Sequence, residues 1–454
     1  MALSVALHLF GSPGSVRANG AFPDGEQMLF PRSHPDHMFV ATNFGLVLSE
    51  DGGESWQWVC ESPFILTALA HLYQLGAGMR VFAVSTAGLV HSDDAGCTWT
   101  PGGGLEGLIA TDAFVDFRDP TRVFALAQTP QGIHTAYASD DSGETFGALL
   151  YTGRIDEVLT GIESATSDPQ IVYLASYMLV GDGERVVRFQ RSMDGGSSWE
   201  STALTDQLAG TMRIIQVDPE DPAHVFMRLT TPDLDDQLIV TEDGGATYRT
   251  LLDRPGSMRA FLRRSDGSYL ATWEAAAIVE AFRSEDGGDS FEPWPLAIRA
   301  RAFTERDGRL YALGSESFDG HALFVSGDDG ATWEPVMRYA DMTGPKACLV
   351  EHCGPACVEY ADMKLWPVQI CPAPPPEVES DAGAAVDAGA PRPRIPTANI
   401  TPASGCGVST AARRGFDAGH LLSGLLFALV AGRCRRSRPG RARRLSSMHP
   451  YGRV

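Results

Sequence analysis

The hydrophobic residues of this chain fall into short runs that come in pairs. HMFVATN is followed by GLVLS, RVFAVST by GLVHS, and RLYALGS by HALFVS. The runs are rich in β-branched and aromatic residues, and Gly or polar residues separate them, which is the pattern of short β-strands joined by turns. Such pairs recur from about residue 27 to residue 340, so the pattern predicts an all-β protein built from internal repeats.

An octet of residues with a fixed template follows each pair of runs. The template is hydroxyl-x-Asp-x-Gly-x-hydroxyl-aromatic, and it occurs seven times. Successive octet aspartates are 42 to 53 residues apart, which is the length of one four-stranded propeller blade. The octet aspartates are Asp51, Asp94, Asp141, Asp194, Asp243, Asp286 and Asp328.

The residue types of the octet suit a tight turn between two strands. Asp and Ser side chains bond backbone amides of their own turn, Gly supplies a positive φ, and the final aromatic residue begins the next strand and packs into the core. Corners containing Asp and Pro lie upstream in several repeats, as in SHPDH, FRDPTR, SDPQ and DPEDP, and Pro cannot continue a β-ladder. Each repeat therefore predicts strand, corner, strand, loop, strand, octet, strand.

The seven repeats predict a seven-bladed β-propeller of four-stranded antiparallel blades over residues 22–343. QMLFPR supplies an inner strand for the first blade, and the seventh blade runs from AIRARAFTE to TWEPVMR. Neither blade needs a strand from the other. We expect ring closure to rest on packing between the first and seventh blades and on the Cys-rich segment that follows, residues 344–371.

The octets resemble the Asp-box, or BNR, repeat of sialidases, xyloglucanase-type glycoside hydrolases, sortilin-type receptors and the plastid photosystem assembly propellers. The resemblance covers roughly residues 27–340. It implies that the octets have a structural role and that they lie on the propeller face opposite the ligand site. The seven octet aspartates would then be spread around a ring, too far apart for a glycosidase pair, whose carboxyls lie within about 10 Å of each other.

The charge of the chain limits its partners. The formal net charge is −21, but the last 50 residues hold ten Arg and a single acid, so residues 1–404 carry −30. Such an acidic body repels phosphate backbones and anionic lipid, which excludes nucleic acid as a partner. A cation, a basic protein or a neutral glycan is compatible with this charge.

Loops between second and third strands supply the candidate ligand-binding residues, because the resemblance places the ligand face there. These loops are rich in acids and aromatic residues, which an acidic surface contains in any case. They could also provide two carboxylates facing each other across a cleft, as in a glycoside hydrolase. The candidates are Asn43, Phe44, Asp182, Glu184, Asp233, Asp235, Asp236, Trp273, Glu274, Glu316, Phe318, Asp319 and His321.

Sialidase activity is not expected. The sialidase resemblance implies an Arg-Ile-Pro motif in the first blade, but the corresponding segment here is LFPRSHPDH. The tripeptide occurs only at Arg394-Ile395-Pro396, in a Pro/Ala-rich linker. The sequence shows no catalytic motif, so a binding domain is favoured over an enzyme.

Ca²⁺ is the one cofactor for which the sequence contains a candidate site. The DLDDQ cluster of Asp233, Asp235 and Asp236 could hold Ca²⁺ together with backbone oxygens. Its spacing matches no recognised calcium loop, so we predict no metal and no other cofactor.

Six cysteines are disulfide candidates. Cys348, Cys353, Cys357 and Cys371 form a cluster after the last repeat, which predicts two disulfides with three possible connectivities in an exported protein. A four-thiolate zinc site is the alternative, but the cluster lacks the second paired knuckle that such sites have. Within the propeller, Cys60 and Cys97 are either joined in a disulfide between neighbouring blades or two separate buried thiols.

Both ends of the chain suggest export. Residues 1–21 resemble a truncated signal peptide, with a disordered apolar tail as the alternative, and residues 372–404 form a Pro/Ala-rich disordered linker. Residues 405–454 contain a short apolar stretch and then an Arg cluster. This tail resembles the MYXO-CTERM sorting segment, which implies Cys406 as the modified or cleavage-site residue. A basic amphipathic tail on the inner membrane is the alternative, because the apolar stretch is shorter than the roughly 20 residues of a full span.

Taken together, the sequence predicts a monomeric propeller displayed on the cell surface. Its C-terminal tail would engage the membrane and the sorting machinery, and the propeller would bind a protein or polysaccharide ligand or act as a scaffold. The alternatives are a glycoside hydrolase and an assembly factor for another envelope complex.

Overall fold

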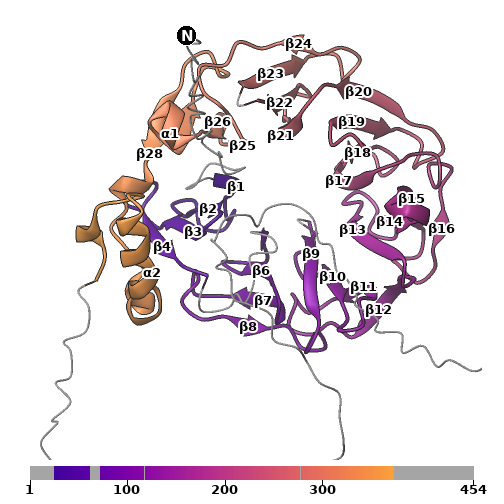
Figure 1. Ribbon diagram of the computed structural model, residues 1–454, viewed down its shortest axis with the longest axis horizontal. Helices are drawn as coiled ribbons and strands as arrows, with labels where there is room; N and C mark the ends of the chain where they lie inside the picture. Colours follow the sequence, from indigo (N-terminus) through magenta and orange to yellow (C-terminus); the bar gives the residue numbers. More distant parts are fainter. Residues whose placement is uncertain (1–24, 62–71, 117, 277, 373–454) are drawn as a thin grey trace, which may run out of the picture. The chain divides into compact units, whose positions relative to one another are not determined.

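The computed structural model describes residues 25–61, 72–116, 118–276 and 278–372. Seven four-stranded antiparallel sheets form the blades of a ring (Figure 1), so the fold is the predicted all-β seven-bladed propeller. Each blade uses four strands that are consecutive in the chain, and the first strand of each blade lies innermost. The prediction that no blade borrows a strand is confirmed.

The strands of blades 1 to 4 are β1 (Gly25–Leu29), β2 (Met38–Thr42), β3 (Gly45–Ser49) and β4 (Gln57–Val59); β5 (Tyr73–Leu75), β6 (Val81–Ser85), β7 (Gly88–Ser92) and β8 (Thr100–Pro101); β9 (Ile109–Val115), β10 (Val123–Gln128), β11 (His134–Ser139) and β12 (Ala148–Thr152); β13 (Glu157–Ser164), β14 (Val172–Leu179), β15 (Arg185–Ser192) and β16 (Glu200–Ser201). The strands of blades 5 to 7 are β17 (Thr211–Val217), β18 (Val225–Thr230), β19 (Asp236–Thr241) and β20 (Arg249–Asp253); β21 (Ser257–Arg263), β22 (Tyr269–Ala275), β23 (Ile278–Ser284) and β24 (Glu292–Pro293); β25 (Ala302–Arg306), β26 (Arg309–Leu313), β27 (Leu323–Ser326) and β28 (Glu334–Met337).

The middle strands of the blades are buried on both faces. Every residue of β2, β3, β6 and β7 is buried, because each blade packs between two neighbours. These strands are therefore almost continuously apolar, whereas a strand with one wet face alternates apolar and polar residues. The paired runs seen in the sequence are these second and third strands.

All seven octets adopt the same hydrogen-bonded turn between the third and fourth strands. In the fifth copy, Thr241 donates to Asp243 at 2.9 Å, and Asp243 accepts from the Thr247 amide at 2.8 Å and from the Thr247 hydroxyl at 2.7 Å. The amide of Gly245 donates to the Thr241 hydroxyl at 2.8 Å. The template residues therefore satisfy one another within the turn, as the sequence predicts.

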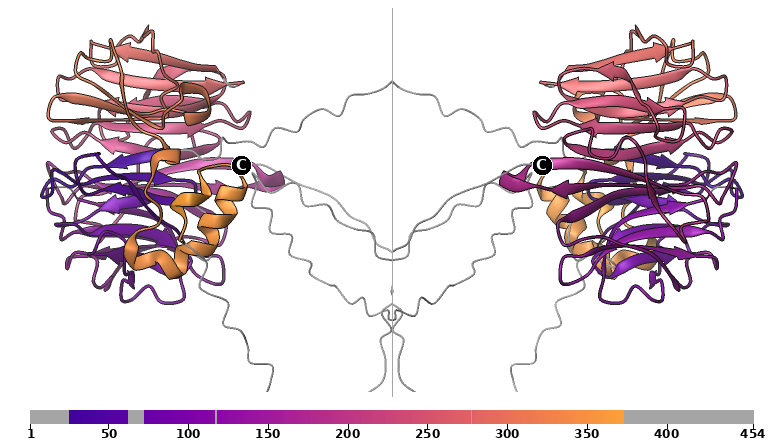
Figure 2. Two further views of the ribbon diagram at one scale, coloured as in Figure 1. Left: turned by 90° about the vertical axis from the view of Figure 1, so that its left-hand side faces the viewer. Right: turned by 90° about the vertical axis from the view of Figure 1, so that its right-hand side faces the viewer.

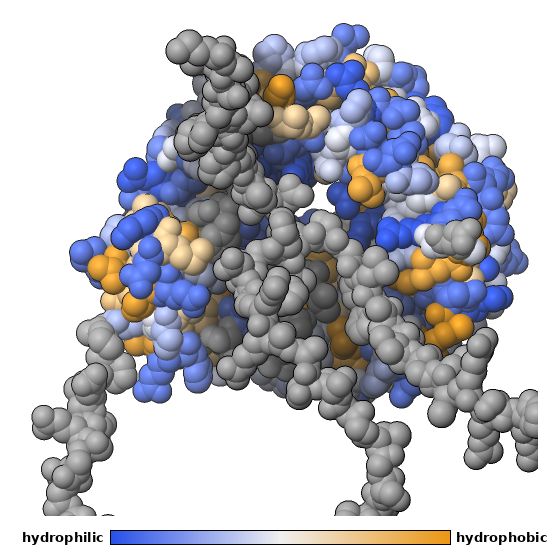
Figure 3. All heavy atoms as spheres, viewed as in Figure 1, coloured by the Kyte–Doolittle hydropathy of each residue, from blue (hydrophilic) through white to orange (hydrophobic). Residues whose placement is uncertain are grey.

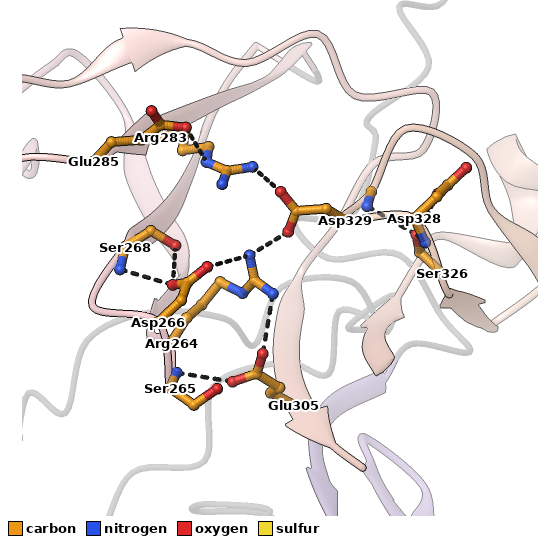
Figure 4. A network of polar contacts seen from close by, with 11 residues as sticks. Arg264, Ser265, Asp266, Ser268, Arg283, Glu285, Glu305, Ser326, Asp328 and Asp329 are labelled. Carbon is orange, nitrogen blue, oxygen red and sulfur yellow. Dashed lines mark hydrogen bonds and ion pairs between the residues drawn. The ribbon is translucent and has the colours of Figure 1, made fainter. Parts of the chain in front are cut away.

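Arginine side chains cross the contacts between neighbouring blades, which we call seams, on the face that carries the octets. Between blades 6 and 7, Arg264 lies among Asp266, Glu305 and Asp329, and Arg283 also binds Asp329 (Figure 4). Other seams follow the same plan, with Arg80 bound to Glu144, Arg122 to the Pro169 carbonyl, Arg249 to the Gly288 carbonyl and Arg306 to the Pro35 carbonyl. Many of the arginines in this acidic protein thus hold blades together.

A C-terminal segment, residues 343–371, packs against blade 1, and we call it the clasp. It contains η3 (Ala347–Leu349), α2 (Val350–Asp362) and η4 (Val368–Ile370), and it follows η2 (Tyr339–Asp341). The Trp58 amide donates to the Gly344 carbonyl at 3.0 Å, and the Lys346 amide donates to the Trp58 carbonyl at 2.9 Å. The clasp therefore adds a parallel edge to β4, and α2 stands beside the blade (Figures 1 and 2).

Three disulfides involve the clasp, and their pairing corrects the sequence-based hypotheses. The bonds are Cys60–Cys353, Cys97–Cys348 and Cys357–Cys371. All six candidates are bonded, but the proposed Cys60–Cys97 bond is wrong, and so is the expectation of two bonds inside the cluster. Cys60 of blade 1 and Cys97 of the blade 2 octet each bind the clasp instead, so the clasp ties the end of blade 7 to blades 1 and 2.

Within the described part of the chain, no helix is long and apolar enough to cross a membrane. The expected signal peptide, the Pro/Ala-rich linker and the tail with Cys406 lie outside the described residues.

Candidate functional site

The two faces of the ring carry different loops. Successive turns of an antiparallel meander alternate between its two edges, so the octets share one face with the turns between first and second strands. The opposite face, which Figures 1 and 3 view, carries the loops between second and third strands and the connections between blades. The β14–β15 hairpin projects from this face (Figure 2). Figure 3 shows an opening near the middle of the ring, and the described side chains along its edge are mostly hydrophilic.

The first predicted loop is part of the core. Asn43 is half-buried, and the Phe44 side chain is only 1% exposed. The Phe44 ring lies 5.1 Å from Tyr339 and 5.7 Å from Trp366, centroid to centroid. The clasp thus covers this loop of blade 1, and Phe44 stabilises the fold where a ligand contact was expected.

The predicted residues of blade 4 lie at the tip of the projecting hairpin. Asp182 belongs to η1 (Gly181–Gly183), and Glu184 follows it with an exposed side chain. The backbone closes the tip, since the Val180 amide donates to the Glu184 carbonyl at 2.9 Å.

The acids of the β18–β19 loop serve different purposes. Asp233 is exposed. Asp235 accepts from the Gly256 amide at 2.7 Å, and the buried Asp236 accepts from the Thr230 hydroxyl at 2.6 Å and from the Met258 amide at 2.9 Å. Because Asp235 and Asp236 bond different groups of blades 5 and 6, they join these blades and do not converge on one point as calcium ligands would.

The predicted residues of β22 separate into a core residue and a charged one. Trp273 is 1% exposed and packs in an apolar cluster formed by blades 5 and 6, so it is not a ligand platform. Glu274 accepts from Arg259 at 2.6 Å and lies 3.5 Å from Arg301 of blade 7. Glu274 therefore bridges two arginines on adjacent blades.

The last predicted loop contains the short helix α1 (Glu316–Asp319). Glu316 accepts from the Tyr339 amide at 2.6 Å, and burial raises the pKa of its carboxyl. Asp319 accepts from the amides of Ser315 at 2.8 Å and Arg299 at 3.1 Å, so both acids have structural bonds. Phe318 is exposed, and the Arg299 guanidinium lies 3.7 Å from its ring centroid.

His321 lies at the end of the same loop. Its side chain is half-buried, and its ring centroid is 5.9 Å from that of Phe324 in β27. Of the predicted set, Asp235 and Asp236 of one blade and Glu274 of the next border the same segment at the junction of blades 5 and 6: Asp235 and Asp236 accept from the Gly256 and Met258 amides, and Glu274 is the strand partner of Ser257.

Four arginines that sequence reasoning missed lie on blades 5 to 7 around this junction, and we call them the arginine cluster: Arg213, Arg228, Arg259 and Arg301. Arg213 of β17 and Arg228 of β18 are direct cross-strand partners. Arg259 lies where the register of β21 shifts, between Met258 and Ala260. Such a bulge re-aims side chains and is common beside functional sites.

The electrostatics of Arg228 show how close the guanidinium groups are. Burial lowers its pKa, and the charges of Arg213 and Arg259 lower it further, while Asp236 opposes them. Among the described residues, the side chains of Arg213 and Arg228 form no hydrogen bond or ion pair, whereas Arg259 and Arg301 share Glu274. Like charges directly opposite on two strands repel each other, so this part of the face favours a bound anion.

Two carboxyls on inner strands have pKa values far from normal. Burial raises the pKa of Asp112 to about 6, although Arg213 acts in the opposite direction. Burial also raises the pKa of Glu163 to about 8, against the hydrogen bond from the Val217 amide and with the help of Asp112. A carboxyl that stays protonated near neutral pH can act as a general acid.

One group of metal-ligand types lies together in the part of the chain that the structure describes. The ligand atoms of His91, Asp93 and Glu144 lie within 4.8 Å of one another, on the octet face. Arg80 is 2.6 Å from Asp93 and 2.7 Å from Glu144. Its guanidinium already supplies the positive charge that a metal would bring, so we assign this group to the seam between blades 2 and 3.

The sequence contains a signal for the arginine cluster. Met-Arg occurs five times in the chain, and three of these dipeptides lie wholly within strands, at Met212-Arg213 in β17, Met227-Arg228 in β18 and Met258-Arg259 in β21. A charged residue within a buried strand needs a partner or a solvent-filled opening. The dipeptides mark the strands, but only the register shows that Arg213 and Arg228 face each other.

No family model matches the sequence, and no curated protein does. Solved structures similar in fold include YCF48 from Cyanidioschyzon merolae, 13% identical with a TM-score of 0.40 over 67% of this chain and 94% of that chain. The BP39L lectin from Burkholderia pseudomallei is 12% identical, with a TM-score of 0.48 over 70% of this chain and 99% of the lectin. Hadza microbial sialidase Hz136 is 12% identical, with a TM-score of 0.38 over 61% and 70% of the two chains. These similarities concern the fold alone.

Proposed function

We propose that this protein is a binding propeller that holds a carboxylate-bearing ligand on the face opposite the octets. Arg213, Arg228 and Arg259 are the binding residues. The observation that carries this proposal is the cross-strand pair of Arg213 and Arg228, which have no hydrogen-bond or ion-pair partner among the described residues. A carboxylate between the two guanidinium groups would relieve their repulsion and accept the paired N–H donors that Arg presents.

The charge of the rest of the protein restricts the size of the ligand. Residues 1–404 carry a formal charge of −30, so a long polyanion is repelled before it reaches the arginine cluster. One carboxylate, or a short acidic segment, carries few negative charges and is repelled less strongly. At the arginine cluster it then gains several charge-assisted hydrogen bonds. The ligand is therefore a locally acidic molecule and not a uniformly charged polymer.

Binding of small carboxylates tests the proposal. Acetate, succinate, citrate and glucuronate are titrated at constant ionic strength, with the melting temperature and calorimetric heat as readouts. We expect at least one of them to bind to the wild-type protein and to bind about 10-fold or more weakly to R213Q/R228Q, since each charge-assisted bond contributes about 1.5–3 kcal/mol.

The matched control is Arg254→Gln, which removes an arginine of the same blade and face that already pairs with Glu280 at 2.9 Å. This variant should bind the carboxylates as the wild type does. Equal binding by the wild type and R213Q/R228Q would contradict the proposal, as would the absence of binding by every carboxylate tested.

A glycoside hydrolase is the second candidate function, and Asp112 and Glu163 favour it. Their carboxyls lie on neighbouring inner strands, and both pKa values are raised, to about 6 and about 8. Glu163 would be the general acid and Asp112 the base or nucleophile. Release of reducing ends from a panel of neutral polysaccharides, abolished in both D112N and E163Q, would support an enzyme.

Export to the cell surface is part of the same proposal. Three disulfides are typical of proteins that fold in an oxidising compartment. The MYXO-CTERM-like tail with Cys406 would then anchor or sort the chain. Protease treatment of intact cells should degrade the propeller, and a protein that is protected until the cells are lysed would contradict surface display.

A further inference from the structure

Exposed apolar side chains concentrate on the face that carries the arginine cluster. The described residues include twelve exposed large hydrophobic ones, and half of these lie in loops or at strand ends of this face. Hydrophobic patches are visible among hydrophilic side chains around the face in Figure 3. The residues at the loops are Ile155, Leu179, Val180, Leu234, Ile278 and Phe318.

These six residues, which we call the apolar tips, follow the ring from blade 4 to blade 7. Leu179 and Val180 belong to the β14–β15 hairpin of blade 4, and Ile155 lies in the connection that enters this blade. Leu234 lies in the β18–β19 loop, Ile278 begins β23 and Phe318 is in α1. The arginine cluster lies on blades 5 to 7, so the tips flank it along the same arc of the ring.

Hydrogen bonds hold the tips in place. The Leu179 amide donates to the Asp156 carbonyl at 2.8 Å, which joins the hairpin to the turn that holds Ile155. In the next blade the Thr231 amide donates to the Asp235 carbonyl at 2.9 Å, and this closes the loop around Leu234. An apolar group that is fixed while exposed loses little entropy when a partner covers it.

Leucine is energetically unfavourable at position 234 for two independent reasons. Its side chain is 72% exposed, and its φ is +68°, in the left-handed region that favours Gly or Asn. Either property alone disfavours leucine at a solvated turn. Strained residues of this kind concentrate at ligand-binding positions.

We infer that this face docks an acidic polypeptide segment whose apolar side chains cover the tips while its carboxylates reach the arginine cluster. The inference rests on the proposed function and names the chemistry of its ligand. We infer an acidic partner from charge complementarity, because Arg213 and Arg228 lie inside the arc of apolar tips. A specific protein interface usually has an apolar core and a polar rim, and Arg is one of the residues enriched among those that contribute most of the binding energy.

The chemistry of the tips favours a polypeptide over the other ligand classes. Five of the six tips are Leu, Ile or Val, which pack against side chains but offer no flat ring to stack on a sugar. A membrane surface with anionic lipid is disfavoured because residues 1–404 carry −30. A locally acidic segment of a protein meets both conditions.

Selection from a displayed library of random dodecapeptides on the immobilised wild-type protein tests the inference. We expect the selected peptides to combine Asp or Glu with Leu, Ile or Phe. A synthetic peptide of the commonest sequence is then titrated by fluorescence anisotropy. It should bind L234N/I278T about 10-fold or more weakly than the wild type, because burial of each apolar side chain contributes about 1.5 kcal/mol or more.

The controls separate a lost contact from a lost fold. L234N places Asn at a positive φ, so its melting temperature should not fall. Leu149→Thr and Met193→Gln remove exposed apolar side chains from an outer strand and from an octet, and neither should alter peptide affinity.

Several outcomes would overturn the inference. It fails if no peptide is selected, if selected peptides lack acids or apolar residues, or if L234N/I278T binds the peptide as the wild type does. Tip-dependent binding to phosphatidylglycerol vesicles would make the face a membrane site instead. If R213Q/R228Q loses the peptide while L234N/I278T keeps it, the proposed carboxylate site stands and only the apolar docking is refuted.

Discussion

Octet aspartates are held ionised by the residues of their own turns. Hydrogen bonds from the hydroxyl and amide of Ser55, with a further bond from Ser49, lower the pKa of Asp51 to about 2, and equivalent bonds act on Asp141 and Asp194. All partners of each aspartate come from the same octet. The aspartates are therefore turn-forming groups whose acceptors are already used, and they have no capacity left for chemistry.

Removal of one octet aspartate should destabilise the protein without altering binding. Asp243→Ala leaves the amide and hydroxyl of Thr247 and the hydroxyl of Thr241 without their acceptor. We expect a loss of about 1–3 kcal/mol in the free energy of unfolding, measured in urea. Glu220→Ala, which removes an exposed side chain, is the control. Unchanged stability of Asp243→Ala would contradict the structural role of the octets.

Glu163 makes a separate prediction about pH. Its pKa is raised to about 8 in the folded protein, so between about pH 4.5 and pH 8 the folded state binds a proton that the unfolded state has released. The contribution of this group to stability is therefore present at low pH and is lost as the pH rises to 8.

Comparison with Glu163→Gln isolates that effect, because Gln stays neutral and can still accept from the Val217 amide. The variant and the wild type should be similarly stable at pH 5, and the variant should be more stable by about 2–4 kcal/mol at pH 8.5. Urea unfolding at the two pH values measures this. A stability difference that does not change with pH would show that Glu163 is ionised throughout.

At the scale of single residues, the sequence predicted the chemistry that is local. The octet bonds involve residues at most four apart, so their template is visible in the chain. The arginine cluster depends on register, because Arg213 and Arg228 are 15 positions apart and face each other only once β17 and β18 are paired. Phe44 and Trp273 were expected in ligand loops, but the clasp covers the first and the second lies within β22.

The clasp is the element that the sequence described least completely. Its cysteines predicted disulfides, but their partners depend on which surface the segment covers. The loop after β4 and the blade 2 octet both border the clasp, so Cys60 and Cys97 bond it and not each other. Trp58 packs against Trp366, with ring centroids 5.2 Å apart, and this apolar contact fixes the orientation.

The two bonds from the clasp to the propeller should act redundantly. Cys60–Cys353 and Cys97–Cys348 span 293 and 251 residues, and either bond alone restricts most of the unfolded chain. Removal of either bond by Cys→Ser pairs should cost about 1–3 kcal/mol, and removal of both should cost about 5 kcal/mol or more. Denaturant unfolding of the single and double variants measures this.

The Cys357–Cys371 bond provides the comparison, since it closes only 14 residues within the clasp. Its removal should have the same effect whether or not the other two bonds are present. If the losses in the free energy of unfolding on removing Cys60–Cys353 and Cys97–Cys348 are strictly additive, the two bonds do not act redundantly.

At the scale of the whole molecule, the fold follows from repetition. Seven octets at blade spacing fixed the number of blades, and four consecutive strands per blade fixed the topology. A structural role for the octet face and a ligand site on the opposite face were expected only from the Asp-box resemblance. In the structure, arginines of the octet face join blades through charged contacts (Figure 4), while those of the opposite face include two whose side chains form no hydrogen bond or ion pair among the described residues.

The position of a bound carboxylate in a crystal tests the central claim most directly. A crystal of the protein soaked in 4-iodobenzoate should show an anomalous iodine peak at the junction of blades 5 and 6, with the carboxylate between Arg213 and Arg228. The peak should be absent from crystals of R213Q/R228Q. Iodine peaks only elsewhere on the protein, or the same peak in the double variant, would contradict the account.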